Sequence, residues 1–248
     1  LFYLFSVELS LSFFPACLST LSALFLLAAG TLFVFVLPFS RYNLILTFLT
    51  TLTLSTVLES LVAMTFGVNV KSLFSESWSS SIEFFGIYIT PIQIVIISSG
   101  ISLLILLSSL VHLTPLGRRI RALSANGAAA QSLGVSEKGF SLGIFSLGVV
   151  LAGYAGILVG YESNLQPTMG GIFTIKAFAA MVLGGLGNIW GTLLGAYILG
   201  FIENFSLGLT FWGQSLPASW KDAFAFVIIV VVLLFRPNGL FGAEERKS

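Results

Sequence analysis

Residues 117–140 read GRRIRALSANGAAAQSLGVSEKGF and form the one long polar interval in an otherwise apolar chain. Their charges are mostly basic: Arg118, Arg119, Arg121 and Lys138 stand against a single acid, Glu137. On each side lies an apolar run long enough to cross a bilayer, which takes about 20 residues of helix. Short loops rich in Lys and Arg beside membrane spans stay in the cytoplasm, because translocating those cations is unfavourable. We therefore predict a cytoplasmic loop over residues 114–138, with two short helices that meet at a turn at Asn126-Gly127.

The composition excludes a water-soluble fold. Of the 248 residues, 56% are hydrophobic and 8% are charged, whereas soluble domains carry roughly 25% charged residues. The formal charge of +1 gives no electrostatic reason for a nucleic-acid partner. Cys17 is the single cysteine, which excludes an internal disulfide and a Cys-based metal site. We predict an all-α, polytopic transmembrane helical bundle surrounded by lipid.

Six apolar segments divide the chain, which we interpret as one transmembrane domain over residues 1–248. Their approximate bounds are 11–37, 43–66, 91–113, 139–161, 176–205 and 220–235. Pro38 is expected to end the first segment, and Arg41 behind it indicates the cytoplasmic side. Residues 1–10 would then lie outside, and the chain starts with Leu rather than Met. We expect from this that the start is truncated.

The second segment carries a polar stripe. Its polar residues recur at every fourth position and therefore share one helix face: Thr47, Thr51, Ser55 and Glu59. A carboxylate inside a membrane span is costly and usually faces a bundle interior or a wet cavity. Two interpretations stay open. Either Glu59 and the stripe line a translocation path, or the hydroxyls bond to their own helix or a neighbouring one and Glu59 reaches toward the interface.

The fifth segment, residues 176–205, is the most informative for topology. At ~1.5 Å per residue it makes about 45 Å of helix, too long for one span and too short for two. Ahead of it, Pro167 and the pair Gly170-Gly171 are expected to break any helix. The sixth segment should end inside because basic residues follow it, so the fifth must enter from the outside and return there. We predict paired part-depth helices, a broken or re-entrant pair, that meet at GGLGNIWG.

The meeting point of these helices is a candidate element of a translocation path, because non-helical backbone at membrane depth requires protein or water around it. Its candidate residues are Gly184, Gly185, Gly187, Asn188 and Gly191. The alternative is packing alone, in which Gly187, Gly191 and Gly195, spaced by four, form a GxxxG face. Both interpretations use the same glycines and stay open.

Four pieces of sequence, in this order, carry a resemblance to a known family. They are LGRRIRALSANGAAAQSLGV at 116–135, KAFAAMVLGGLGNIWGTLLGAYILG at 176–200, Lys221-Asp222, and RPNGLFG at 236–242. Together they resemble the branched-chain amino acid permease family of ABC importers. The first piece is similar to the EAA-type cytoplasmic loop of such permeases: Ala129, Ala130 and Gly134 match, while Ala128 stands where that pattern has Glu. The family's opening helices have no counterpart, which fits a fragment or a divergent member.

The resemblance implies a mechanism and partners. The loop would dock into a groove on a cytoplasmic ATP-binding subunit through the coupling residues Arg118, Arg119, Arg121, Ala129, Ala130 and Gly134. A second permease subunit and a periplasmic or extracellular substrate-binding protein are further implied partners. The chain would be a multi-pass permease domain of the bacterial inner (plasma) membrane that translocates branched-chain or related amino acids.

The sequence offers no catalytic constellation. It has no GxxxxGK[ST] motif, and its single histidine, His112, lies at the inner end of a span without a second ligand in sight. We predict no enzyme activity, cofactor or metal site, with ATP hydrolysis on partner subunits. Urea, short amides and sugars stay open as substrates. An ion-coupled secondary transporter is a second class, although only Glu59 is clearly inside a span while Lys176 and Glu203 are placed near segment ends. A structural subunit without a path is a third.

Overall fold

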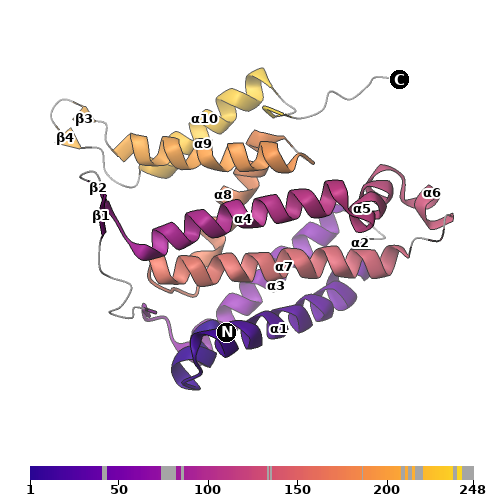
Figure 1. Ribbon diagram of the computed structural model, residues 1–248, viewed down its shortest axis with the longest axis horizontal. Helices are drawn as coiled ribbons and strands as arrows, with labels where there is room; N and C mark the ends of the chain where they lie inside the picture. Colours follow the sequence, from indigo (N-terminus) through magenta and orange to yellow (C-terminus); the bar gives the residue numbers. More distant parts are fainter. Residues whose placement is uncertain are drawn as a thin grey trace. The chain divides into compact units, whose positions relative to one another are not determined.

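The computed structural model describes residues 1–40, 44–73, 82–84, 87–132, 134, 136–185, 187–207, 210–211, 214–215, 220–236 and 239–241. They fall into two compact units, Leu1–Pro167 and Thr168–Ser248. Nearly all of the described secondary structure is helical (Figure 1), which confirms the predicted all-α class. Within the described ranges, four helices are long and apolar enough to cross a membrane, and one bent pair is a fifth candidate. That each predicted span crosses at its predicted bounds, within a single domain, stays a prediction.

The first unit holds most of the long helices. Its elements are η1 (Leu4–Glu8), α1 (Phe13–Thr31), η2 (Leu32–Val36), α2 (Leu37–Ser40), α3 (Leu44–Phe66), β1 (Ile82–Phe84), β2 (Ile87–Ile89), α4 (Pro91–Leu113), α5 (Pro115–Ala125), α6 (Gly127–Ser132) and α7 (Glu137–Glu162). Helices α1 and α7 lie side by side (Figure 1). A side chain at Gly153 of α7 would meet Leu24 of α1, so the missing Cβ lets the two helices approach closely.

Helix ends in this unit follow local sequence signals. Thr90 and Gln93 form a capping box in front of α4, with Pro91 in the first turn. The Ser136 hydroxyl accepts the amide of Gly139 at 3.3 Å and caps α7. These contacts satisfy amide groups that a helix start leaves without an intrahelical partner.

The first apolar segment runs further than expected. Helix α1 passes into the π-helical turn η2 and then into α2, so the helix continues through Pro38 to Ser40. Proline lacks an amide proton and crowds the carbonyl four residues earlier, and the widened π turn lies directly before it. The expectation that Pro38 ends this helix is therefore wrong by two residues.

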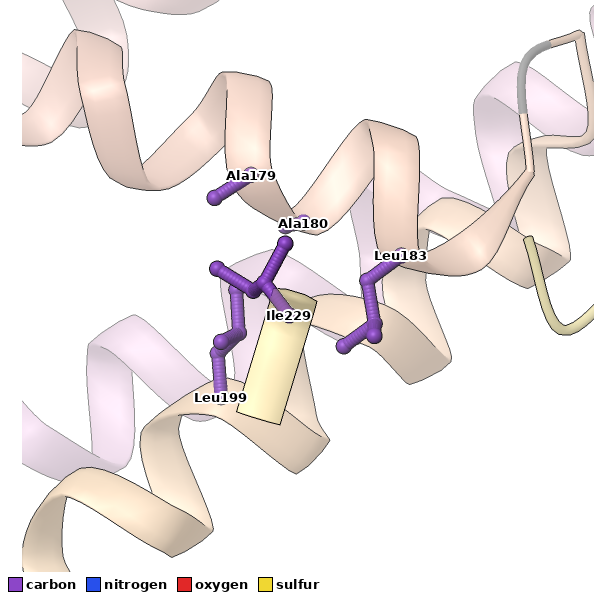
Figure 2. Close-up of a cluster of buried hydrophobic side chains, with 5 residues drawn as sticks. All are labelled: Ala179, Ala180, Leu183, Leu199 and Ile229. Atoms are coloured by element: carbon purple, nitrogen blue, oxygen red, sulfur yellow. The ribbon is translucent and has the colours of Figure 1, made fainter. Parts of the chain in front are cut away.

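The second unit is built around a broken helix. It contains α8 (Met169–Gly184), α9 (Ile189–Leu207), the two-residue strands β3 (Thr210–Phe211) and β4 (Gln214–Ser215), and α10 (Trp220–Phe235). The bend between α8 and α9 is 119°, which confirms a break inside the fifth segment. A buried apolar cluster holds the three helices together (Figure 2): Ala179, Ala180, Leu183, Leu199 and Ile229. At 16 residues, α10 is about 24 Å long, shorter than the ~30 Å apolar core of a bilayer.

The start of α8 corrects one expectation. Gly170 and Gly171 lie inside the helix rather than breaking it, because α8 begins at Met169. Each glycine costs roughly 1 kcal/mol in a helix interior, but these two occupy the first turn, and the packing of α8 against α9 outweighs their cost. As a consequence, Lys176 lies in the middle of α8 and not near the end of a segment.

Candidate functional site

The predicted cytoplasmic loop is a helix-turn-helix formed by α5 and α6. Thr114 caps α5, accepting the amide of Gly117 at 3.2 Å, and Asn126 caps α6, accepting the amide of Ala129 at 3.0 Å. Gly117 is buried, and a side chain there would collide with the carbonyls of Leu110 and Val111 in α4. The loop therefore leaves α4 in a fixed direction.

The predicted coupling residues differ in exposure. Arg118, Arg119, Arg121, Ala129 and Gly134 are exposed. The guanidinium of Arg121 donates to the carbonyl of Val111, and that of Arg119 lies 5.9 Å from the ring centroid of Phe140. Ala130 is 3% exposed and belongs to the packing of the loop. Gly134 has φ +84°, the left-handed backbone that is common for a glycine following a helix.

Glu59 makes no contact with the predicted coupling residues among the residues that the structure describes. The carboxylate is partly exposed on α3 and has no hydrogen-bond partner among the described residues. In the same stripe, the Thr51 hydroxyl donates to the carbonyl of Phe48 at 2.9 Å. Bonding of a hydroxyl to its own helix is the packing interpretation of the stripe, and the position of Glu59 in a path stays a prediction.

The break between α8 and α9 is a close contact of two backbones. A side chain at Gly184 would collide with the carbonyl of Gly191, and one at Gly195 would lie 2.9 Å from the amide nitrogen of Gly184. Gly187 does not belong to this face: it lies between the helices with φ +87° and has open space around it. The packing face is thus Gly184, Gly191 and Gly195, and the expected series beginning at Gly187 is corrected.

Much of the backbone at the break already has partners. Asn188 caps α9, its Oδ1 accepting the amide of Gly191 at 3.1 Å. The amides of Leu240 and Phe241 donate to the carbonyls of Leu183 and Gly184 at 2.9 and 3.0 Å. The C-terminal segment therefore caps the end of α8, where a helix leaves carbonyls without partners. Fewer polar groups remain for a solute here than the sequence alone indicates.

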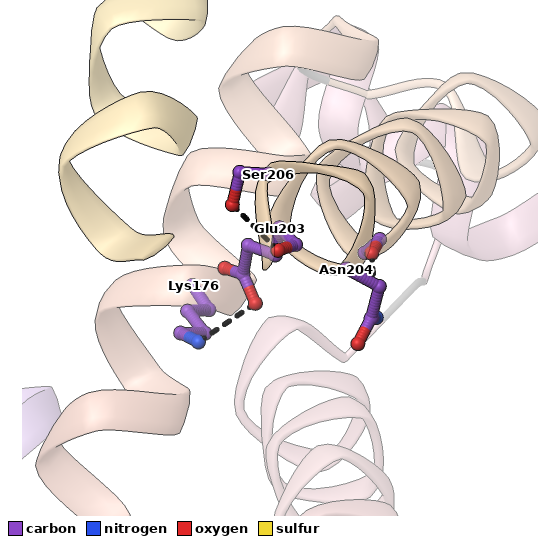
Figure 3. A network of polar contacts seen from close by, with 5 residues as sticks. Lys176, Glu203, Asn204 and Ser206 are labelled. Atoms are coloured by element: carbon purple, nitrogen blue, oxygen red, sulfur yellow. Dashed lines mark hydrogen bonds and ion pairs between the residues drawn. The ribbon is translucent and has the colours of Figure 1, made fainter. Parts of the chain in front are cut away.

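A polar pair that the sequence reasoning missed lies away from the break. The Nζ of Lys176 on α8 is 2.9 Å from the Oε2 of Glu203 on α9 (Figure 3). The Glu203 side chain is 9% exposed and that of Lys176 is 31% exposed. The sequence did contain an indication of this pair, because Lys176 and Glu203 are the only charged residues between positions 169 and 207. Isolated opposite charges within apolar helices generally pair with one another.

The pair forms one edge of a cavity of about 120 Å³ between α8, α9 and α10. Its remaining lining is apolar: Ile172, Ile175, Ala179, Leu199, Phe226 and Ile229. Among the described residues, the lining therefore places one cation and one anion beside a hydrocarbon wall.

The long apolar helices, the exposed helix-turn-helix and the broken pair define a multi-pass membrane protein. The family model described as branched-chain amino acid transport system / permease component matches residues 2–233. The chain belongs to this family, as the resemblance predicted.

Individual relatives agree with the family match. The chain is 32% identical over 197 residues to the high-affinity branched-chain amino acid transport system permease protein LivH of Escherichia coli, covering 77% of this chain and 62% of the relative. It is 34% identical over 161 residues to BraD of Pseudomonas aeruginosa, a permease protein of the same kind of system, covering 64% and 50%. The ribose import permease protein RbsC of Escherichia coli is 37% identical over 136 residues, covering 52% and 40%. The chain thus spans less than two thirds of each of these relatives, and no solved structure matches it.

Proposed function

We propose that the protein is the membrane-spanning permease subunit of an ATP-binding-cassette importer in the bacterial inner (plasma) membrane. Its cargo would be branched-chain or related amino acids. The observation that carries the proposal is the family match over residues 2–233. The relatives LivH and BraD are named as permease proteins of branched-chain amino acid transport systems, and we extend that role to this chain.

The helix-turn-helix supplies the docking element of this proposal. Its first helix, α5, is held against α4 by the buried Gly117 and by the bond from Arg121 to Val111. A movement imposed on α5 would therefore be passed to α4 as a rigid body. The partners are separate ATP-binding subunits that hydrolyse ATP, a second permease subunit, and a periplasmic or extracellular substrate-binding protein. The chain itself is proposed to be a transport subunit and not an enzyme.

Charge reversal on the loop tests the proposal. Arg118 is exposed on α5, and its guanidinium has no hydrogen-bond or ion-pair partner among the described residues, so Arg118→Glu changes the docking surface without breaking a side-chain contact. Arg236→Glu is the matched control, since Arg236 is also exposed but lies at the end of α10. The assays are co-purification of the ATP-binding subunit and ATP-driven leucine uptake in proteoliposomes that hold the complete transporter.

We expect Arg118→Glu to weaken both signals about tenfold or more, because a like charge placed across an interface costs several kcal/mol, and Arg236→Glu to leave both unchanged. Full co-purification and uptake by Arg118→Glu would contradict docking through this loop. Leucine uptake that follows an ion gradient without any ATP-binding subunit would overturn the importer proposal and favour an ion-coupled transporter.

A sugar is the second candidate cargo, favoured by the match to the ribose import permease protein RbsC. The same proteoliposomes distinguish the two cargoes when labelled leucine and labelled ribose are compared side by side. Uptake of ribose and not of leucine would assign the chain to sugar transport.

A further inference from the structure

The cavity beside Lys176 and Glu203 combines two features that a structural ion pair alone does not require. One is a cation and an anion at hydrogen-bond distance on different helices, 2.9 Å apart. The other is an unfilled apolar volume directly beside them. Figure 3 shows Lys176 on α8 and Glu203 on α9 pointing toward one another. An ion pair that only fastened α8 to α9 would be expected to have its stems packed rather than to border a cavity.

The geometry points to a binding site for an aliphatic zwitterionic amino acid, with its carboxylate on Lys176, its ammonium on Glu203 and its side chain in the cavity. This inference deepens the proposed function and rests on it. In the bound state the direct contact between Lys176 and Glu203 is replaced by two charge-assisted hydrogen bonds to the ligand. The ligand's opposite charges, on neighbouring atoms of one molecule, are complementary to the pair.

Charge selects the class of ligand. A simple anion would be attracted by Lys176 and repelled by Glu203, and a simple cation would meet the opposite balance. A zwitterion is attracted by both residues and adds no net charge when it binds, so its binding buries no uncompensated charge of the ligand. An uncharged sugar would leave the two charges to be satisfied by hydroxyl groups and would place polar groups against Ile172, Leu199 and Phe226.

The volume and lining of the cavity select the side chain of the ligand. A cavity of about 120 Å³ is close to the ~150 Å³ of apolar cavities that take up benzene. An isobutyl or sec-butyl group fits such a space. The walls are hydrocarbon from three helices, and Ile229 among them is buried at 8% exposure. Branched aliphatic amino acids therefore match both the charges and the wall.

Functional-group removal tests the assignment on the complete transporter in proteoliposomes. The competitors are 4-methylpentanoate, which is leucine without its ammonium group, and 3-methylbutylamine, which is leucine without its carboxylate. The wild type should discriminate against both. Glu203→Gln should raise the KM for leucine about 10- to 100-fold, the loss expected for one hydrogen bond to a charged group, and should relax discrimination against 4-methylpentanoate only. Lys176→Met should relax discrimination against 3-methylbutylamine only.

The double variant Lys176→Glu with Glu203→Lys distinguishes a role of the pair in ligand binding from a role in holding α8 to α9. It restores an ion pair between α8 and α9 but reverses its direction relative to the cavity. We expect normal amounts of assembled transporter and a KM for leucine still raised about tenfold or more, because one reversed contact costs at least a charge-assisted bond. A KM equal to that of the wild type in the exchanged variant would show that the pair only fastens the helices, and would overturn the site.

A second measurement leaves both charges in place, in case the charge variants do not assemble. On a Cys17→Ser background, which removes the single cysteine, Ile175→Cys places a thiol on the cavity wall and Phe178→Cys places one on the same helix outside the lining. Leucine should slow modification of the first by a methanethiosulfonate reagent and leave the second unchanged. Equal rates with and without leucine at both positions would overturn the site. Failure of the wild type to take up leucine with ATP would instead overturn the proposed function, and this inference with it.

Discussion

Gly195 lies on the face of α9 that contacts α8, and we predict that Gly195→Ala destabilises the second unit. A methyl group there would lie 2.9 Å from the amide nitrogen of Gly184 and would also collide with the carbonyl oxygen of Ala180. Both are backbone atoms of α8, so no change of a side-chain rotamer relieves the contact. The two helices have to move apart, which opens the packing around Leu183.

The expected change in the free energy of unfolding for Gly195→Ala follows from two opposing terms. Inserting a methylene-sized group into a packed contact costs roughly 1–3 kcal/mol, and two backbone collisions place Gly195→Ala in the upper half of that range. Replacing glycine by alanine inside a helix returns up to ~1 kcal/mol, which leaves a net loss of about 1–2 kcal/mol. Gly200→Ala is the matched control, because Gly200 lies on the same helix with nothing within 4 Å, and only the helix-propensity gain of up to ~1 kcal/mol applies.

Thermal unfolding of the purified chain in one detergent, followed by tryptophan fluorescence, compares the two variants. One kcal/mol corresponds to roughly 2–4 °C in a chain of this size, so the midpoint for Gly200→Ala should exceed that for Gly195→Ala by roughly 5–10 °C. Equal midpoints, or a midpoint for Gly195→Ala above that of the wild type, would refute the backbone contact between α8 and α9.

Two further substitutions test the caps at the break and at the loop. Asn188→Ala removes the acceptor for the amide of Gly191 and the donor to the carbonyl of Phe241, and should destabilise the unit by about 0.5–2 kcal/mol. Asn188→Asp keeps the first contact and should lose less stability, which the thermal midpoints of the two variants will show. Gly134→Ala places a residue with a side chain at φ +84°, at a cost of roughly 1–2 kcal/mol. The control Gly127→Ala, in open space at the start of α6, should not lower stability. An equal effect of both variants on the melting midpoint would contradict the left-handed turn.

Local signals made much of the fold predictable from the sequence. The basic residues of the loop indicate its side of the membrane by their charge alone. Pro91 lies in the first turn of α4 and Ser136 directly before α7, and each acts within one helical turn, so its effect can be read without knowing the fold. Gly134 belongs to the same group, because a left-handed turn after a helix favours glycine.

The features of the second unit that the sequence did not predict depend on contacts between distant segments. The start of α8 at Met169 is set by packing along α9, which outweighs the low helix propensity of Gly170 and Gly171. The pairing of Lys176 with Glu203 spans 27 residues across a bend, and the bend angle depends on the left-handed backbone of Gly185 and Gly187. No periodicity of the sequence encodes such an angle, although the isolation of the two charges does indicate that they pair.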